Sequence, residues 1–453
     1  MAETYVFLGP SLRLAEAERL LPGATFLPPI RHGDLLRINP KAGDRVLIID
    51  GLFMLTPPVR HREILDALQR GVHVSGSSSM GAMRAAELWP YGMRGIGTVF
   101  ELFRDGVVTG DDEVAVVHAP AEADYASLSE PLVNLRITLT AAAGAGHLTQ
   151  AEADTLLELG RSLPFRARGP KALEHLARAA LADDSIDRYL AWHAAHPLDA
   201  KADDARLLLR LAATQAPELT RPNISLARIE HVETGTFERW RARHRGERVG
   251  DRWVPDASAV AAIMALHPDV PALHRRHVLA LISGGYPATP DADLERRALG
   301  FARARGLLDD GDPDRIRASE WLAPSERHLA AEEAALRVLV RTMGTVVCAP
   351  LSERALPPAL LDASVVAVAR QFVRAALELT DRLPKPDAHR PHLRLGFRPD
   401  AVNAVFAALW DRPLAELPAA AWDRGFAGLA QLHRATEPFV AMLKVAGPPR
   451  FPF

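Results

Sequence analysis

The sequence has a single cysteine, Cys348, among its 453 residues. One thiol excludes disulfides within the chain, CxxC redox pairs, cysteine-based zinc sites and iron–sulfur ligation, so nothing here requires an oxidising compartment. No apolar run approaches the roughly 20 residues that a membrane-spanning helix needs. The amino-terminal residues also lack the apolar stretch of a secretory signal. These absences predict a cytoplasmic protein without a membrane segment.

An excess of charge of either sign is missing too. The 54 Lys and Arg residues nearly balance the 56 Asp and Glu residues, which gives a formal net charge of −2. Without a basic excess there is no electrostatic footprint for nucleic acid, and no nucleic-acid partner is expected. Aromatic residues make up only 6% of a chain rich in Ala, Leu and Arg, which favours helix for most of its length.

Short β-prone runs alternate with helical patterns in the first 120 residues. Strands are expected at 4–8, 24–27, 45–49, 72–74 and 113–117, with helices at 12–21, 59–69 and 80–88. Such alternation predicts a parallel sheet with right-handed crossovers, in a Rossmann-like or flavodoxin-like domain. After residue 120 the patterns are helical, including a helix opened by a capping box at Thr149 and Glu152. The predicted fold class is an α/β parallel-sheet domain followed by a mostly α-helical carboxy-terminal extension.

Polar residues follow the predicted strands. In an open parallel sheet, ligands bind at the carboxyl ends of the strands, so these residues should share one crevice. Hydroxyls, carboxylates, a guanidinium and imidazoles together suffice for acyl-transfer or hydrolytic chemistry. The residues are Ser11, Arg31, His32, Asp34, Asp50, Ser77, Ser78, Ser79 and His118.

The segment Gly76–Gly81, GSSSMG, joins the fourth predicted strand to a helix and has three interpretations. It resembles in shape, though not in spacing, the G-x-S-x-G elbow that exposes a nucleophilic serine. It could equally offer backbone N–H groups at a helix N-terminus to an anion. Alternatively, Ser78 or Ser79 is only a helix N-cap.

Two carboxylates in the set are ambiguous in the same way. Asp50 is a general base or an orienting group, or only a turn former beside Gly51. Asp34 follows Gly33 and could simply cap the next helix. A nucleotide-binding module is disfavoured because no phosphate-loop lysine follows any of the turns. No cofactor and no metal site are expected.

Eight sequence blocks in order resemble the core domain of TfuA-like proteins over roughly residues 1–185. They are LGPSL (8–12), GDLL (33–36), IDGLF (49–53), HREILDALQRGVHV (61–74), SSMGAMRAAEL (78–88), YGMRGIG (91–97), RDG with DDEVAV (104–116) and LSEPLVNLR (128–136). The resemblance implies a core domain at 1–185. We then expect a helical segment and linker at 186–256, which includes the polar stretch 233–256, and a mostly helical domain of unknown role at 257–453.

The resemblance also implies partners and an activity. TfuA-like proteins are partners of YcaO enzymes, which use ATP to activate a peptide backbone amide during biosynthesis of modified peptides. In thioamide formation the TfuA-like partner is implied to hydrolyse the C-terminal thiocarboxylate of a ThiS-like carrier and so supply sulfide. Cys348 lies outside the resembling region, which agrees with hydrolysis by oxygen chemistry rather than a cysteine persulfide. The precursor peptide is a further candidate partner.

A thiocarboxylate hydrolase needs a nucleophile or base and donors for the developing oxyanion. On this hypothesis Ser78 and Ser79 supply the nucleophile or the oxyanion donors, and Asp50 is the base or orienting group. The predicted substrate-binding residues are Ser11, Arg31, Asp34, Ser77, Arg84 and His118. The alternative function is a non-catalytic adaptor that activates or scaffolds the YcaO enzyme.

Overall fold

The computed structural model describes residues 2–52, 56–214, 234–285, 289–309, 311–348, 351–382 and 398–452. They form two compact units, an amino-terminal unit, Met1–Val232, and a carboxy-terminal unit, Glu233–Phe453. The predicted fold class is confirmed: a five-stranded parallel sheet with helices is followed by a mostly helical remainder. None of the helices in these ranges has the length and apolar character needed to cross a membrane. The domain boundaries predicted at 185 and 256 stay predictions.

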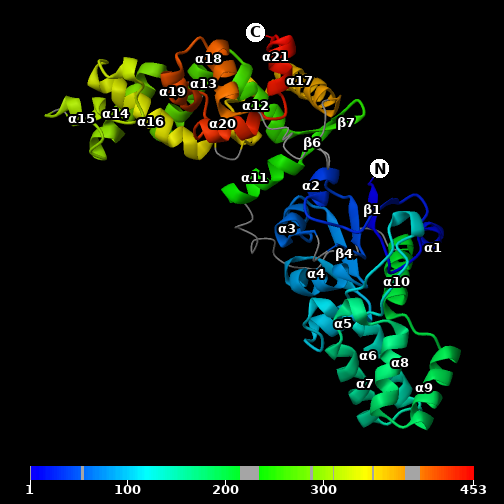
Figure 1. Ribbon diagram of the computed structural model, residues 1–453. Helices are drawn as coiled ribbons and strands as arrows, with labels where there is room; N and C mark the ends of the chain where they lie inside the picture. Colours follow the sequence, from blue (N-terminus) through cyan, green and yellow to red (C-terminus); the bar gives the residue numbers. More distant parts are fainter. Residues whose placement is uncertain are drawn as a thin grey trace. The chain divides into compact units, whose positions relative to one another are not determined.

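The amino-terminal unit is built on a sheet with the strand order β2-β1-β3-β4-β5 (Figure 1). The strands are β1 (Thr4–Phe7), β2 (Thr25–Leu27), β3 (Arg45–Ile48), β4 (His73–Ser77) and β5 (Arg94–Ile96), and all pair in parallel. This is the flavodoxin-like order. Strand β2 is added on one side of β1 and strand β3 on the other, so the strand order reverses between β1 and β3. Ligands bind such folds at that switch point, beyond the carboxyl ends of the two strands.

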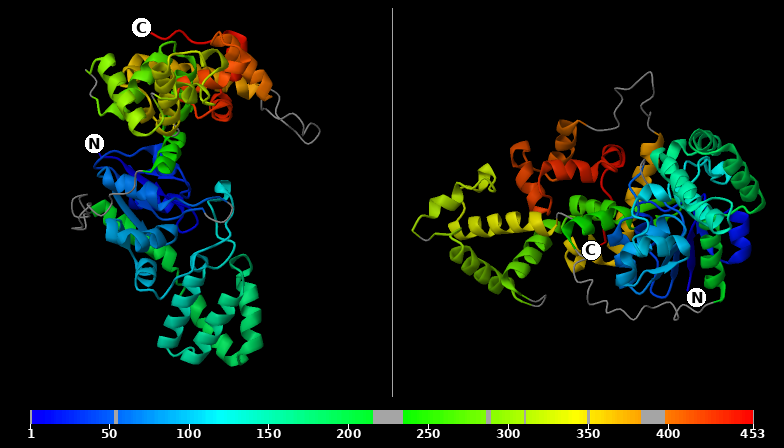
Figure 2. Two further views of the ribbon diagram at one scale, coloured as in Figure 1. Left: turned by 90° about the vertical axis from the view of Figure 1, so that its left-hand side faces the viewer. Right: turned by 90° about the horizontal axis from the view of Figure 1, so that it is seen from below.

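Helices cover both faces of the sheet, as apolar strands in a parallel sheet require (Figures 1 and 2). One face packs against α2 (Asp34–Ile38), α3 (His61–Gln69), α4 (Met80–Leu88) and α5 (Thr98–Arg104). The other packs against α1 (Leu14–Leu20) and α10 (Ala200–Thr214). The two cores separate residues that alternate along one strand: Leu47 contacts the α1 and α10 side, whereas Ile48 contacts the α3 and α4 side.

Helix α10 runs antiparallel to the strands. Near its C-terminus, the Ala212 carbonyl accepts a hydrogen bond from the guanidinium of Arg45, the first residue of β3 (2.6 Å). Near its N-terminus, the Asp204 carboxylate accepts from the N–H groups of Thr98 and Val99, just beyond the carboxyl end of β5 (2.8 and 2.7 Å). The N-terminus of α10 therefore lies at the carboxyl edge of the sheet.

The fifth strand was predicted wrongly. Residues 113–117 form no strand: Asp111–Glu113 is a short 3-10 turn, and Val114 is buried in the irregular segment after it. The fifth strand is β5, at the GIG sequence that propensity disfavours. Gly95 is needed there because a Cβ atom would lie 2.0 Å from the ring of Phe100. Close packing of α5 against the strand thus overrides intrinsic preference.

Four helices form a bundle beside the sheet, shown in teal and green in Figure 2. They are α6 (Leu132–Gly144), α7 (Gln150–Ser162), α8 (Pro170–Ala180) and α9 (Asp183–Ala195), and they have a hydrophobic core of their own. The predicted capping box at the start of α7 is confirmed. The Thr149 hydroxyl accepts from the Glu152 N–H (3.2 Å), and the Glu152 carboxylate accepts from the Thr149 N–H (2.7 Å).

The carboxy-terminal unit begins with structure where the sequence suggested a linker. After α11 (Gly235–His244), the strands β6 (Gly246–Val249) and β7 (Arg252–Pro255) pair antiparallel across a turn with Gly250 at φ 65°. The buried α12 (Asp256–Leu266) is the centre of the larger core, and α13 to α16 form a second core. The other helices are α13 (Val270–Ser283), α14 (Asp291–Ala304), α15 (Pro313–Arg317), α16 (Ala331–Val347), α17 (Ala363–Arg382), α18 (Pro399–Leu409), α19 (Leu417–Asp423), α20 (Leu429–Thr436) and α21 (Val440–Ala446).

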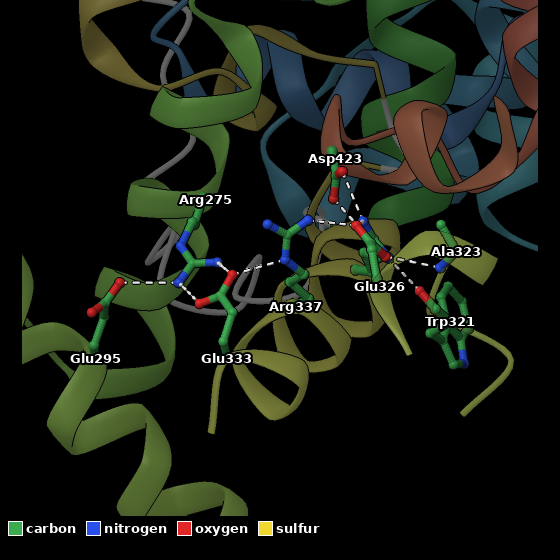
Figure 3. A network of polar contacts seen from close by, with 9 residues as sticks. Arg275, Glu295, Trp321, Ala323, Glu326, Glu333, Arg337 and Asp423 are labelled. Carbon is green, nitrogen blue, oxygen red and sulfur yellow. Dashed lines mark hydrogen bonds and ion pairs between the residues drawn. The ribbon is translucent and has the colours of Figure 1, made fainter. Parts of the chain in front are cut away.

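A buried ion-pair network joins α16 to its neighbours in this unit (Figure 3). The Arg341 guanidinium is fully buried, and it binds both carboxylate oxygens of Glu326 (2.6 and 2.8 Å) and of Asp423 (2.7 and 2.8 Å). Arg337 binds Glu326 and Glu333, and Glu333 also binds Arg275. Each buried charge is therefore met by opposite charges, which burial of an arginine requires.

Candidate functional site

The switch point holds a direct contact between two predicted site residues, Asp50 and Ser11. Asp50 follows β3 and is 1% exposed, and Ser11 lies just beyond β1. Carboxylate oxygen Oδ2 of Asp50 accepts the N–H groups of Gly9 (2.9 Å) and Ser11 (3.0 Å), and Oδ1 accepts the Ser11 hydroxyl (2.6 Å). The Asp50 carboxylate therefore orients the turn after β1, and it accepts a hydrogen bond from the Ser11 hydroxyl.

The serine turn after β4 has an unusual backbone conformation at Ser78. Ser78 has φ 67°, in the left-handed region that residues with a Cβ seldom occupy. The hydroxyls of Ser77 and Ser78 are buried, and among the described residues neither has a hydrogen-bond partner. Ser79 occupies the N-cap position of α4, but its side chain makes no capping hydrogen bond. The capping interpretation of the serines is therefore not supported.

Two glycines let α4 approach the sheet this closely. A Cβ atom on Gly76 would lie 2.1 Å from the Gly81 carbonyl oxygen, and one on Gly81 would lie 1.8 Å from the Ile48 carbonyl oxygen. The Gly81 N–H also donates to the carbonyl oxygen of Ile49 (3.2 Å). Strand, sharp turn and helix therefore pack as in a nucleophile elbow, with small residues on both sides of the strained serine.

Strand register places the two halves of the site side by side. Ile48 pairs with Gly76 between β3 and β4, and Asp50 and Ser78 each follow two residues after this last pair. Phe7 pairs with Ile48 between β1 and β3, so the turn containing Ser11 is the next one across. Neighbouring strands are about 4.8 Å apart, which puts these three turns within roughly 10 Å of one another.

The site is closed in this conformation. Ser11, Asp50 and Ser77 to Ser79 are each at most 5% exposed. Residues after β2 pack over the end of β1: the Ile30 N–H donates to the Asp50 carbonyl (2.9 Å), and Pro29 lies against Gly9. A substrate can reach the hydroxyls only after segments over this edge move.

Lys201, at the start of α10, is a site residue that the sequence analysis missed. Its side chain is buried and its ammonium group donates to the Val114 carbonyl (2.9 Å). Burial lowers the pKa of Lys201, while the nearby carboxylates of Asp50, Asp199 and Glu130 oppose that shift. The sequence feature that could have drawn attention to Lys201 is the scarcity of lysine, because the chain has only five lysines among its 54 basic residues. Burial shifts the pKa of a lysine readily, whereas an arginine stays protonated in proteins, so the two are not interchangeable at such a position.

Asn134 connects Lys201 to a second buried acid. Its side-chain oxygen accepts the Lys201 backbone N–H (3.3 Å), and its amide donates to Asp199 (3.0 Å). Burial and the charge of Asp199 raise the pKa of Glu130 to about 7, against the opposing effects of the Lys201 charge and a hydrogen bond to Asn134. The block 128–136, which carries Glu130 and Asn134, thus reaches toward the site.

The remaining predicted residues are engaged elsewhere. The Arg31 side chain is 53% exposed and faces Asp34, whose carboxylate accepts from the Arg31 N–H (3.0 Å) and the Arg37 guanidinium (2.9 Å). Arg84 is buried and donates to the Val59 carbonyl (3.2 Å) and to Glu87 (2.7 Å). With residues 113–117 irregular, His118 is not at a strand end. Its ring contacts the Ala119 carbonyl (2.8 Å) and packs edge-on against Tyr125.

His32 and Cys348 make contacts that are typical of residues with a structural role. His32 Nδ1 lies 3.1 Å from the Pro57 carbonyl oxygen. Cys348 is buried in the carboxy-terminal unit, 3.7 Å from His274, and burial raises its thiol pKa to about 12. A thiol with that pKa is not a nucleophile at neutral pH. Within the described ranges, no three His, Cys, Asp or Glu side chains are grouped so that they could hold a metal ion.

The fold and site define a flavodoxin-like α/β unit with a strained serine turn, an oriented carboxylate and a buried lysine near that carboxylate. Residues 50–169 match the family model described as TfuA-like protein, so the chain contains a TfuA-like domain over these residues. No curated protein matches the chain. TfuA-like proteins are generally associated with YcaO-dependent thioamidation. The match includes Asp50 and the serine turn but not Ser11 or Lys201.

Proposed function

We propose that the amino-terminal unit hydrolyses the C-terminal thiocarboxylate of a ThiS-like carrier and so delivers sulfide to a YcaO enzyme in the biosynthesis of thioamidated peptides. The observation that carries the proposal is Ser78, a strained residue whose buried hydroxyl has no partner among the described residues. A buried hydroxyl without a partner is unfavourable by a few kcal/mol, as is strained backbone, and both are found at functional sites.

The reaction needs no cofactor. The Ser78 oxygen attacks the thiocarboxylate carbon and the C–S bond breaks. The serine proton is transferred to the departing sulfur, so that the sulfur leaves as HS⁻. Water then hydrolyses the acyl-serine ester, which releases the carrier carboxylate and one proton. The net change is RCOS⁻ + H₂O → RCOO⁻ + H₂S. Ser11 is the alternative nucleophile, because its hydroxyl already donates a hydrogen bond to the Asp50 carboxylate, which could accept the proton.

The charges around the turn suit an anionic substrate. The N-terminus of α4 follows Ser79 and presents the positive end of the helix dipole at the carboxyl edge. The N-terminus of α10 lies at the same edge and brings the buried Lys201 with it. These groups would stabilise both the thiocarboxylate and the oxyanion that forms on attack.

The second candidate function is a non-catalytic adaptor that activates or scaffolds the YcaO enzyme and its peptide substrate. The observation that favours it is the closure of the site, in which Ser78 is 0% exposed. A crevice without access holds no substrate. On the catalytic proposal, docking of the carrier must displace the segment at Pro29 and Ile30.

The test follows a thiocarboxylated carrier by mass spectrometry and measures released sulfide. Ser78→Ala should lower sulfide release at least about tenfold, the scale of losing a nucleophile or an oxyanion donor. Ser75→Ala is the matched control, because Ser75 is also buried on β4 but lies below the turn. Ser11→Ala and Ser79→Ala decide between the hydroxyls. No carrier turnover by the unsubstituted protein, with full stimulation of YcaO when sulfide is added, would establish the adaptor instead.

A further inference from the structure

Helices α6 to α9 line a partly open cavity of about 170 Å³. Its walls are apolar: six leucines, Ile186 and Ala177 line most of it. Its volume is close to that of the roughly 150 Å³ dry apolar cavity known to bind benzene in another protein. A space of this size in a bundle of short helices fits one aromatic ring or two fused rings.

Tyr189, His193 and Glu130 lie near one another on the wall of the cavity, which Thr138 and Glu174 also line. Tyr189 and His193 are one turn apart on α9, and their rings stack with centroids 5.8 Å apart and planes 8° apart. Glu130 also lines the cavity, and its charge adds to the effect of burial in raising the pKa of Tyr189 to about 12. The cavity therefore has an apolar body and a group of hydrogen-bonding side chains, the arrangement typical of small-molecule sites.

One atom in this group of side chains has no partner. His193 Nδ1 is buried, and among the described residues it makes no hydrogen bond. Buried polar atoms in native proteins are almost always satisfied, and exceptions call for an explanation. A ligand with one N–H or O–H group would satisfy this nitrogen, whereas the leucine walls would reject a charged molecule.

We propose that this cavity is a binding site for a compact, uncharged organic molecule of one or two fused rings that carries a single N–H or O–H donor. The donor points to His193 Nδ1 and the Glu130 carboxyl group, and the rings fill the leucine-lined body. This site is separate from the serine turn and goes beyond the proposed hydrolysis.

The cavity is connected to the site at the sheet edge. Glu130 is hydrogen-bonded to Asn134, and Asn134 accepts the backbone N–H of Lys201. A ligand that takes a hydrogen bond from Glu130 or gives one to it changes the charge next to Asn134. The arrangement places the ligand two side chains from the lysine of the candidate active site, as an effector site requires.

The probes for the test are indole and indene, which have the same shape but differ in one N–H group. Titration of the full chain by calorimetry and by NMR should give a dissociation constant for indole on the order of 0.1–1 mM. Indole should bind about fivefold or more tightly than indene, because only indole can satisfy His193. Binding of neither probe at several times that concentration would overturn the proposal.

Two variants locate the binding. Ala177→Met fills the cavity from α8 and should abolish binding of both probes, while Ala179→Met on the exposed face of α8 should leave binding unchanged. His193→Phe keeps the ring and removes the nitrogen, so indole and indene should then bind equally. Unchanged binding to Ala177→Met, or an unchanged preference for indole in His193→Phe, would refute the assignment. The second variant also decides the question if Ala177→Met does not fold.

Discussion

The charge pair of Asp50 and Lys201 can be tested by a double-mutant cycle. Asp50→Asn keeps the size of the side chain but removes its charge, and Lys201→Met keeps the length of the lysine stem but removes the ammonium group. Asp50 holds three hydrogen bonds, and Lys201 is buried with one hydrogen bond from its ammonium group to Val114. The two substitutions should therefore differ in effect, although they remove the two halves of one pair.

The magnitudes follow from these contacts. A hydrogen bond to a charged group is stronger than a neutral one by about 1 kcal/mol, so Asp50→Asn loses roughly 3 kcal/mol from three bonds. Two unit charges a few ångströms apart at an effective dielectric constant of 20 attract each other by about 3 kcal/mol, and Asp50→Asn also removes this attraction to Lys201. Relief of carboxylate burial offsets part of this, and we expect a net loss of about 3–5 kcal/mol. Lys201→Met also relieves burial of a charge, and should cost only about 0–2 kcal/mol.

Hydrogen exchange of β1, β3 and β4 peptides under native conditions reads out the amino-terminal unit separately from the other unit. The double variant should be more stable than the sum of the two single effects predicts, by about 1 kcal/mol or more. In Asp50→Asn alone the buried charge of Lys201 is left without its partner, whereas the double variant no longer has that charge. Additivity within about 0.5 kcal/mol would mean that the two groups do not interact. A larger loss for Lys201→Met than for Asp50→Asn would refute the proposed asymmetry.

Two further substitutions test packing and a buried ion pair. Gly81→Ala should destabilise the amino-terminal unit by about 3 kcal/mol or more in chemical denaturation, because its Cβ would overlap a backbone carbonyl; Gly144→Ala, which meets nothing within 4 Å, should leave stability equal or slightly raised. Arg341→Met should cost the carboxy-terminal unit about 3–5 kcal/mol at pH 7. Burial alone would raise the Glu326 pKa, but hydrogen bonds to Arg341 hold it at about 2. The stability that this carboxylate contributes is therefore present above pH 4.5 and is lost between pH 4.5 and 2. In Arg341→Met this slope should flatten, and an unchanged slope would contradict the assignment.

Local patterns predicted the elements that they fully determine. The apolar run 45–49 became β3, the stretch 80–88 became α4, and the Thr149 capping box opened α7 as expected. The fifth strand could not be predicted, because Gly95 is required by contact with Phe100 rather than by strand propensity. The hairpin Gly246–Pro255 was missed because its two short strands, GERV and RWVP, lack the regular alternation of apolar and polar residues that marks a half-buried sheet.

The candidate site was predictable to the extent that it follows strand ends. Asp50, Ser11 and the serine turn come together because parallel strands deliver their carboxyl ends to one edge. Arg31 and Arg84 could not be assigned in this way, since the Arg31 guanidinium pairs with Asp34, and the Arg84 guanidinium binds Glu87 and the carbonyl of Val59. Lys201 comes from a helix more than 120 residues after the serine turn, and no local pattern connects them.

The position of α10 decides where the folded unit ends. The family match at 50–169 begins after β3, so it contains none of β1, β2 and β3, and it also lacks α10. A chain ending at residue 185 has the whole sheet but leaves the face containing Leu47 and Ile49 without its α10 cover. It also lacks Asp204, which caps α5, and Lys201. We therefore expect residues 1–214 to unfold cooperatively and residues 1–185 not to, as followed by circular dichroism on heating. A cooperative transition for 1–185 would show that α10 is dispensable for the fold, and the site would then have to work without its lysine.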